Sequence, residues 1–213
     1  MESFYRMPED TADQERAELL EMLVRLSLQR GGTFKLSSGA ESQFYIDAKR
    51  TAFKAKAKPL IGRAFLRKMA ERGWHPAAVG GRTLGADPII DAIARESLEY
   101  WSAPIDAFAV RKEPKGHGTK QTIEGLIDPR GMRVVIVDDV CTGGGSTGDA
   151  IDKARDAGMD VIGAICLVDR QQGATENLSR LYHCPLESIF KVSELIAEDE
   201  RLHASPVPAG AHS

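Results

Sequence analysis

The sequence contains few cysteines, no long apolar run and no excess of either charge, and each shortage excludes a class of protein. Its three cysteines, Cys141, Cys166 and Cys184, have no metal-binding spacing. An odd number of unpatterned thiols is typical of a reducing compartment. No stretch approaches the ~20 apolar residues of a membrane-spanning helix, and the first residues lack the apolar core of a signal peptide. We therefore expect a cytoplasmic protein that makes no membrane contact.

The charges nearly balance, because 28 Lys and Arg residues oppose 31 Asp and Glu residues, for a formal net charge of −3. A nucleic-acid-binding domain usually carries a basic surface, so we expect no nucleic-acid partner. The 213 residues suffice for one core, since a chain of this length buries roughly 70% of its unfolded surface. We predict a single domain over residues 1–203. A disordered tail, rich in proline and small residues, is expected over 204–213.

One stretch combines three signals of a ligand site. Residues 134–137 are consecutive β-branched residues, which predict a strand buried on both faces. Asp138 and Asp139 follow, then a turn rich in glycine and hydroxyl groups, then a helix that ends at Gly158. The carboxyl end of such a strand is where open α/β sheets bind ligands. Backbone N–H groups of the turn and the start of the helix favour a phosphate there.

Several kinds of loop compete for this stretch. A Walker A loop is excluded, because an aspartate follows the last glycine where Lys-Ser/Thr is needed. A dinucleotide fingerprint fits the spacing of the glycines between 143 and 148, but Asp138 and Asp139 would repel a pyrophosphate at this place. A ribose 5-phosphate site would give both parts of this stretch a ligand. The loop would bind the phosphate, and the two carboxylates would bind sugar hydroxyls or a hydrated Mg²⁺. An ordinary solvated turn is the remaining alternative.

The rest of the chain alternates between strand and helix patterns. Strands are expected at 77–79, 105–110, 133–137, 161–168 and 187–190, and helices at 11–30, about 59–72, from about 89, and 192–201. This order predicts an α/β fold whose open, mostly parallel sheet is flanked by helices. A second glycine-rich turn, at 80–88, offers a second anion site, with an ordinary turn as the alternative.

Two further segments are candidates for covering a ligand. Residues 32–39 and 42–47 predict a hairpin or flap, in which Phe44 and Tyr45 cover a planar base or simply pack in the core. Residues 111–121, which we call the cationic segment, hold Arg111, Lys112 and Lys115 together with His117. Glycine and proline interrupt them, so we predict a mobile loop over 110–122, either a lid for an anion or a solvated surface.

Several of these stretches together resemble a known family. Residues 134–146 read Val-Val-Ile-Val-Asp-Asp-Val-Cys-Thr-Gly-Gly-Gly-Ser and resemble the phosphoribosyl pyrophosphate (PRPP) motif of the type I phosphoribosyltransferases. The whole chain resembles the orotate phosphoribosyltransferases among them. The strings at 111–119, Arg-Lys-Glu-x-Lys-x-His-Gly-Thr, and at 123–125, Ile-Glu-Gly, are highly similar to their catalytic loop. The turn at 80–88 resembles their pyrophosphate loop, and residues 11–50 their N-terminal helix and base-covering hood.

This resemblance implies a reaction. The ribose 5-phosphate group of PRPP would be transferred to N1 of orotate, giving orotidine 5′-monophosphate and pyrophosphate for pyrimidine biosynthesis. The resemblance also implies Mg²⁺, held through PRPP and water without direct protein ligands. It implies a homodimer in which Arg111, Lys115 and His117 serve the neighbouring subunit's site. A phosphoribosyltransferase for another base, a PRPP-sensing regulator and a dinucleotide-dependent oxidoreductase are the alternatives.

The resemblance further assigns roles to residues of this sequence. Catalysis falls to Lys115, His117 and Asp139. PRPP binding falls to Thr83, Arg111, Lys112, Lys115, His117, Asp138, Asp139, Val140, Cys141, Thr142, Gly143, Gly144, Gly145 and Ser146. Orotate binding falls to Tyr45, Ile46, Thr142 and Arg170. Two positions depart from the family pattern: Ser37 replaces a frequent Lys and Gly145 a frequent Thr, whose hydroxyl Ser146 or Thr147 would supply.

Overall fold

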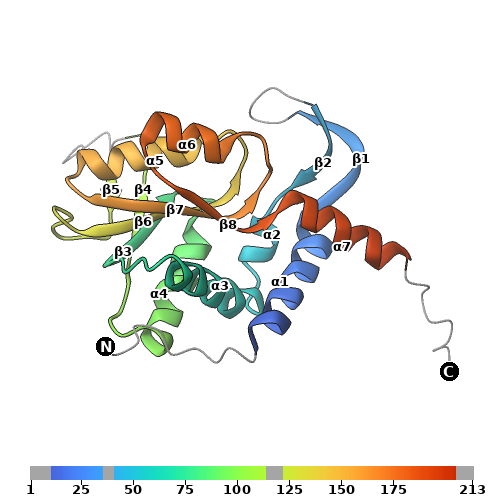
Figure 1. The fold of residues 1–213 in the computed structure, drawn as a ribbon, viewed down its shortest axis with the longest axis horizontal. Coiled ribbons are helices and arrows are strands. Elements are labelled where there is room, and N and C mark those ends of the chain that lie inside the picture. Colours follow the sequence, from blue (N-terminus) through green and yellow to red (C-terminus); the bar gives the residue numbers. More distant parts are fainter. Residues whose placement is uncertain (1–10, 36–40, 114–121, 205–213) are drawn as a thin grey trace.

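A mostly parallel sheet forms the centre of the molecule (Figure 1). The computed structural model describes residues 11–35, 41–113 and 122–204. Within them the strand order is β5-β4-β3-β6-β7-β8, and all neighbouring pairs are parallel except β4 and β5. The strands are β3 (Ala78–Arg82), β4 (Asp106–Val110), β5 (Ile123–Glu124), β6 (Arg133–Cys141), β7 (Asp160–Asp169) and β8 (Leu186–Lys191). The predicted α/β fold is confirmed.

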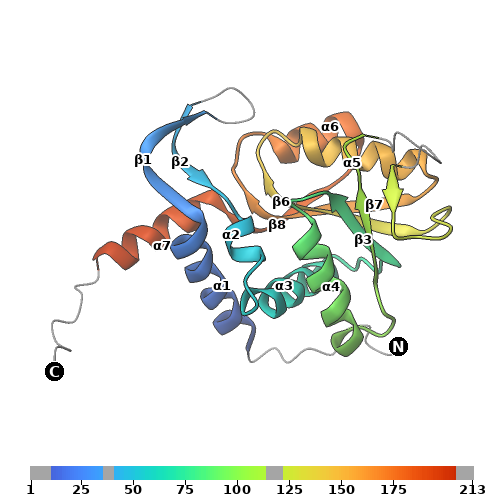
Figure 2. The same cartoon turned by 180° about the vertical axis from the view of Figure 1, so that it is seen from behind.

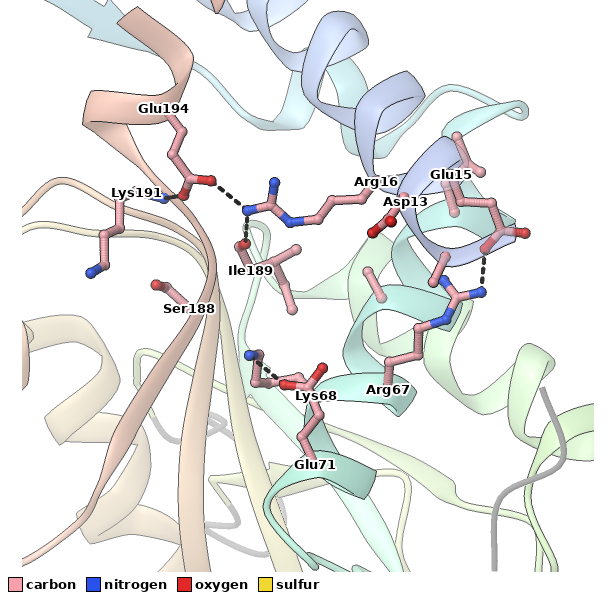
Figure 3. Close-up of a pocket in the computed structure, with 13 residues that line it drawn as sticks. Asp13, Glu15, Arg16, Arg67, Lys68, Glu71, Ser188, Ile189, Lys191 and Glu194 are labelled. Atoms are coloured by element: carbon pink, nitrogen blue, oxygen red, sulfur yellow. Dashed lines mark hydrogen bonds and ion pairs between the residues drawn. The ribbon is translucent and has the colours of Figure 1, made fainter. Parts of the chain in front are cut away.

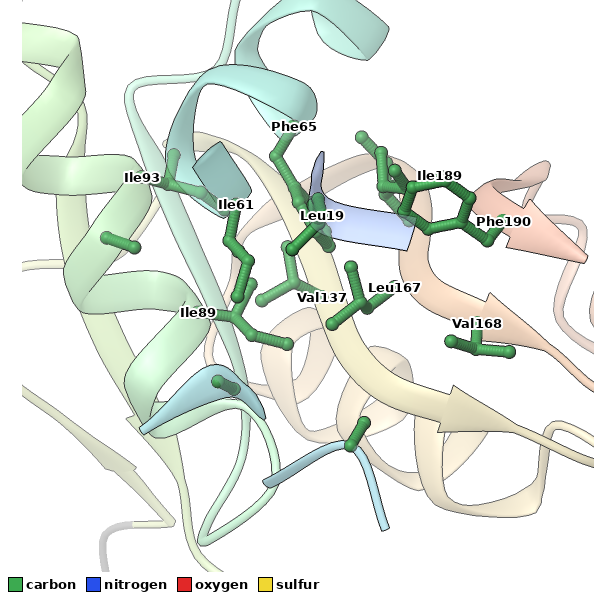
Figure 4. Close-up of a cluster of buried hydrophobic side chains, with 14 of the residues drawn as sticks. Leu19, Ile61, Phe65, Ile89, Ile93, Val137, Leu167, Val168, Ile189 and Phe190 are labelled. Carbon is green, nitrogen blue, oxygen red and sulfur yellow. The ribbon is translucent and has the colours of Figure 1, made fainter. Parts of the chain in front are cut away.

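Strand β6 shows why four β-branched residues stand in a row. Val135 and Val137 face one apolar cluster, whereas Val134 and Ile136 face the other, because side chains alternate across a strand. Helices α3 (Ala57–Glu71) and α4 (Asp87–Tyr100) cover the first face, and α5 (Gly145–Asp156) and α6 (Ala174–Tyr182) cover the second. The first cluster includes Leu19, Ile61, Phe65, Ile89, Ile93, Leu167 and Phe190 (Figure 4). Each such fully buried side chain contributes roughly 1.5–3 kcal/mol of hydrophobic free energy.

A hairpin and three helices stand beside this sheet (Figures 1 and 2). Helix α1 (Ala12–Ser27) packs against α7 (Val192–Ala204), and between the sheet and the hairpin lies the short α2 (Lys49–Ala52). Strands β1 (Leu28–Lys35) and β2 (Glu41–Ile46) pair antiparallel. The buried hydroxyls of Ser27 and Thr51, 2.7 Å apart, connect α1 to α2. The predicted flap is therefore a two-stranded hairpin next to the carboxyl end of β6.

The helix expected at 11–30 was predicted three residues too long. It ends at Ser27, because residues 28–30 pair with residues 44–46 of the hairpin. Gly31 and Gly32, interpreted as a helix stop, lie where the register of that pairing shifts, between Arg30 and Phe34. A strand partner distant in sequence has overridden the local helix pattern.

Other boundaries differ little from the sequence-based predictions. Helices α3, α4 and α5 and strands β3, β4, β7 and β8 lie where periodicity placed them, and β6 continues through Cys141. Helices α2 and α6 and strand β5 were missed. The predicted disordered tail begins one residue too early, because Ala204 is the last residue of α7, while 205–213 lie outside the described residues. None of the helices in the described part of the chain is apolar and long enough to span a bilayer.

Candidate active site

The candidate site lies where the sheet changes its direction of winding. β3 and β6 are neighbours in the sheet, but the chain leaves β3 for α4 on one face and β6 for α5 on the other. Such a switch point opens a crevice at the carboxyl ends of the two strands. The two glycine-rich turns predicted from the sequence are the loops that leave these strands, so the fold brings them together.

The loop after β6 forms a small cradle of about 80 Å³, well above the ~10–15 Å³ that one water molecule needs. Gly144 has φ +81°, a conformation that favours glycine, and precedes the first turn of α5. Asn177 of α6 holds the loop by donating its side-chain amide to the carbonyl of Gly143 at 3.0 Å. The lining residues are Asp138, Val140, Cys141, Thr142, Gly143, Gly144, Gly145, Ser146 and Thr147. Of the residues at 138–146 that were predicted to bind PRPP, all but Asp139 line this cradle.

The two hydroxyl groups that follow Gly145, those of Ser146 and Thr147, differ in burial and in hydrogen bonding. Thr147 is 2% exposed and donates to Asp138 Oδ2 at 2.7 Å. The thiol of Cys141 lies 3.2 Å from the same hydroxyl and is also buried. Ser146 is exposed beside the cradle. Of the two hydroxyls considered as substitutes at Gly145, the structure therefore favours Ser146, because Thr147 is committed to Asp138.

Asp138 is a buried carboxylate. It is 6% exposed and accepts hydrogen bonds from Thr147 and from the backbone N–H of Asp139 at 2.9 Å. Burial, followed by the neighbouring charge of Asp139, raises the pKa of Asp138 to about 7, and the bond from Thr147 opposes that rise. The carboxyl can thus change its protonation state near neutral pH.

Asp139 lies against two elements that sequence analysis did not connect to it. Lys49 Nζ of α2 lies 3.8 Å from Asp139 Oδ2 and 2.9 Å from Asp47 Oδ1. The hydrogen bond to Asp47 raises the pKa of Lys49, with a further contribution from the charge of Asp139. On the opposite loop, a Cβ added to Gly85 would lie 2.6 Å from Asp139 Oδ1. The two loops therefore meet at this carboxylate.

The remaining PRPP candidates that the structure describes follow the carboxyl ends of β3 and β4. Thr83 follows β3, is exposed, and donates its backbone N–H to the carbonyl of Val110 at 3.3 Å. Arg111 leaves β4 and its guanidinium lies 3.5 Å from Glu124. Lys112 is exposed. Lys115 and His117 lie outside the described residues.

The orotate candidates lie on β2 and after β7. Arg170 is 5% exposed, donates to the carbonyl of Phe44 at 3.3 Å, and its guanidinium lies 5.5 Å from the centre of the Phe44 ring. Burial lowers its pKa, and Tyr45 opposes this. Tyr45 is 36% exposed and stacks on Phe34, whereas the side chain of Ile46 is buried in the core. Ile46 can therefore offer a ligand only its backbone.

Sequence reasoning missed several residues of this site. Lys49 follows the flap in a run of mixed charges, and no pattern there points toward the aspartates. Asn177 belongs to a helix that was not predicted. Phe44 was recognised as an aromatic, but its contact with Arg170 joins residues 126 positions apart. These contacts depend on tertiary structure.

A second pocket, of about 300 Å³, lies between α1, α3 and the β8–α7 corner (Figure 3). Charged side chains line it, but they pair with one another. Arg16 binds Glu194, Arg67 binds Glu15 and Lys68 binds Glu71. It contains no residue that the sequence predicted for a site, and its balanced charges favour no particular ligand.

Comparison with known proteins agrees with this geometry. Residues 59–197 match the family model described as a phosphoribosyl transferase domain. The orotate phosphoribosyltransferase of Aquifex aeolicus is 46% identical, over 85% of this chain and 98% of that protein. That of Nostoc sp. is 41% identical over 84% of each. The crystal structure of the Mycobacterium tuberculosis enzyme in complex with PRPP superimposes with a TM-score of 0.69 and 37% identity, covering 85% of this chain and 98% of that one.

Proposed function

Because the chain belongs to the orotate phosphoribosyltransferase family, we propose that the residues at the switch point divide the family's reaction among them. The enzyme transfers ribose 5-phosphate from PRPP to N1 of orotate and forms orotidine 5′-monophosphate. The bond that breaks joins C1 of the ribose to pyrophosphate, and the bond that forms joins C1 to N1. C1 gains positive charge in between, so catalysis is mainly positioning and electrostatics.

The cradle after β6 binds the 5-phosphate in this proposal. Its backbone N–H groups and the start of α5 offer donors and a positive dipole end to an anion. The alternative use, for a dinucleotide, places a pyrophosphate beside two carboxylates. The sugar of PRPP instead places hydroxyls there, which donate to Asp138 and Asp139.

Asp139 is the catalytic carboxylate of the pair. Its side chain is partly exposed, in contrast to that of Asp138, so its charge can stabilise the positive character that develops on C1. The ammonium of Lys49 lies beside Oδ2 of Asp139 and helps to hold this carboxylate. Asp138, buried beneath, keeps the pair in place through Thr147.

We assign Mg²⁺ as the cofactor. Among the described residues no cluster of three or more His, Cys, Asp or Glu forms a protein cage for a metal ion. The adjacent carboxylates of Asp138 and Asp139 suit Mg²⁺, which retains water and is often bound by one or two carboxylates together with substrate phosphates. Asp138 and Asp139 are the carboxylates that would hold its water ligands, and the bound ion would neutralise charge on the departing pyrophosphate.

The pyrophosphate side is assigned to Thr83 and the cationic segment. Arg111 and Lys112 begin that segment next to the loop of Thr83. Lys115 and His117 follow in the sequence and supply further positive charge, and His117 donates a proton to the leaving group. Orotate is assigned to the space between Arg170, Thr142 and the backbone of Tyr45 and Ile46, where the guanidinium faces its carboxylate.

We also propose a homodimer with shared active sites, in which Arg111, Lys115 and His117 of one subunit serve the site of the other. The catalytic domain spans residues 1–203 and binds no nucleic acid. A cytoplasmic location agrees with the three free, buried thiols, Cys141, Cys166 and Cys184.

The observation that carries the proposal is the meeting of the twin aspartates with both glycine-rich loops at the switch point. A spectrophotometric assay of orotate tests it. Orotate is expected to disappear only when PRPP and Mg²⁺ are both present. Consumption of adenine or uracil in its place, or orotate loss without PRPP, would contradict the proposed substrate pair.

Replacing Arg170 with alanine is expected to weaken orotate binding by about 30-fold or more, because truncating one partner of a buried charge pair costs ~2–5 kcal/mol. PRPP binding is expected to change less than about threefold. Calorimetry measures both affinities. Arg72→Ala is the matched control, since Arg72 lies 5.7 Å from the Trp74 ring, away from the site. Equal losses for both ligands would make Arg170 a structural residue.

Replacing Thr147 with valine is expected to raise the pKa of Asp138 further, because the hydrogen bond that opposes the rise is lost. The acid limb of kcat/KM for PRPP should move upward by about one pH unit. Ser97→Ala removes a buried hydroxyl in the last turn of α4, at the end of that helix opposite the second loop, and should lower stability without moving that limb. An unshifted limb in Thr147→Val would separate Asp138 from PRPP binding.

A further inference from the structure

Lys153 of α5 is committed to the backbone of another element. Its ammonium donates to the carbonyl of Arg111 at 3.1 Å, to the carbonyl of Lys112 at 2.8 Å and to Asp149 Oδ2 at 2.9 Å. An ammonium group has three donors, so these contacts use all of them. The side chain is 17% exposed, although a lysine on a helix usually extends into water.

Asp149 extends this cluster to a third element. The same oxygen that accepts from Lys153 lies 3.7 Å from Nε of Arg82. Arg82 is the last residue of β3 and directly precedes Thr83 of the second loop. Asp149 and Lys153 stand one turn apart on α5, whose first turn forms the phosphate cradle. The three charged side chains therefore connect the three elements that carry the proposed PRPP contacts.

The contacts of Lys153 fix the path of the chain where it leaves β4. The N–H of Arg111 donates to the carbonyl of Thr122 at 2.8 Å, while its carbonyl accepts from Lys153. The next carbonyl, that of Lys112, accepts from Lys153 as well. Because both peptide groups are held, the directions in which the side chains of Arg111 and Lys112 depart are held too.

We propose that Lys153 is a positioning residue for the pyrophosphate half of the reaction. It does not touch substrate. It fixes the start of the cationic segment on the helix that binds the 5-phosphate, and with Asp149 and Arg82 it keeps the second loop in register with both. This inference rests on the proposed function, because Arg111 and Lys112 matter here only as pyrophosphate ligands.

Lys153→Met, which keeps the length of the side chain and removes its ammonium, tests this role. Turnover is expected to fall about 10–100-fold, the size of effect that a ~1 Å misplacement produces. In the reverse reaction, KM for pyrophosphate should rise about tenfold, while the KM values for orotate and orotidine 5′-monophosphate stay within about twofold. Lys153→Arg, which can donate to both carbonyls, should recover most of the turnover.

Arg155→Met provides a matched control on the same helix. Arg155 also donates to a backbone carbonyl, that of Tyr182 at 2.6 Å, but at the end of α6. Its kinetics should equal those of the unsubstituted enzyme. The inference is overturned if Lys153→Met matches Arg155→Met, or if it raises the KM for orotate as much as that for pyrophosphate. Should Lys153→Met not fold, Lys153→Gln is judged by the same criteria.

A hybrid dimer separates this inference from the proposed sharing of sites. One subunit carries Asp139→Asn and the other Lys153→Met. If the cationic segment serves the neighbouring subunit, one complete site forms, and the hybrid should show about half the activity of the unsubstituted dimer. A hybrid no more active than the Lys153→Met homodimer contradicts shared sites, while the kinetic result for Lys153 stands. An unsubstituted enzyme that consumes no orotate contradicts the proposed function itself.

Discussion

Replacing Asp138 with asparagine is expected to lower turnover by about 10²–10³-fold and to stabilise the folded protein above neutral pH. Turnover falls because the site loses a carboxylate beside the ribose. Asparagine can still accept from the N–H of Asp139 and bond to Thr147, so the fold should persist. Stability rises because the buried charge, which folding disfavours, is gone.

The pH dependence of this effect follows from the direction of the pKa shift. Folding raises the pKa of Asp138 to about 7, whereas in the unfolded chain this carboxyl has its ordinary pKa of 3.8. Between these values the folded state binds more protons, so the free energy of unfolding falls as pH rises and stays low above 7. Relative to the unsubstituted protein, Asp138→Asn should gain on the order of 2–4 kcal/mol above pH 7 and nothing near pH 4.

Urea denaturation from pH 4 to pH 9 measures this difference. Asp152→Asn is the matched control, because Asp152 is an exposed carboxylate on α5, and the pH dependence of the unsubstituted protein should persist in that variant. A constant difference between Asp138→Asn and the unsubstituted protein at all pH values would contradict the raised pKa. Full turnover in Asp138→Asn would remove this carboxylate from the reaction.

The cradle was predictable from the sequence because its signals are local. Four β-branched residues require a strand buried on both faces, and the glycines that follow require a tight turn before α5. These signals lie within fifteen consecutive residues and do not depend on the rest of the chain. The same holds for the second loop, so the topology that joins both loops followed from the alternation of strands and helices.

The surroundings of the cradle were not predictable, because they depend on contacts between distant segments. The end of α1 is set by pairing of residues 28–30 with the second strand of the hairpin. Lys49 and Lys153 are ordinary lysines in sequence, and only the packing of α2 and α5 directs them to a carboxylate and to two carbonyls. Local patterns therefore identified the groups that we propose bind substrate but not those that we propose position them.

The second loop determines where Asp139 can lie, and Gly85 makes this testable. A methyl group at Gly85 would lie 2.6 Å from Oδ1 of Asp139 and 2.9 Å from its Cγ. These separations are too short, so one of the two groups must move. Oδ1 also accepts the N–H of Val140 at 2.9 Å, and Oδ2 faces Lys49. Displacing this carboxylate breaks both contacts and shifts its charge away from the proposed position of the ribose.

Gly85→Ala is therefore expected to lower turnover by about 10²-fold without unfolding the protein, since a misplacement of ~1 Å can have that effect. Asp139→Asn alone should cost about 10²–10³-fold. If Gly85→Ala acts through Asp139, adding it to Asp139→Asn should cost little more, whereas independent effects would multiply. Measuring kcat for the unsubstituted enzyme, the two single variants and the double variant decides between coupled and independent effects. A double variant as slow as the product of the single effects would show that the second loop acts on another group.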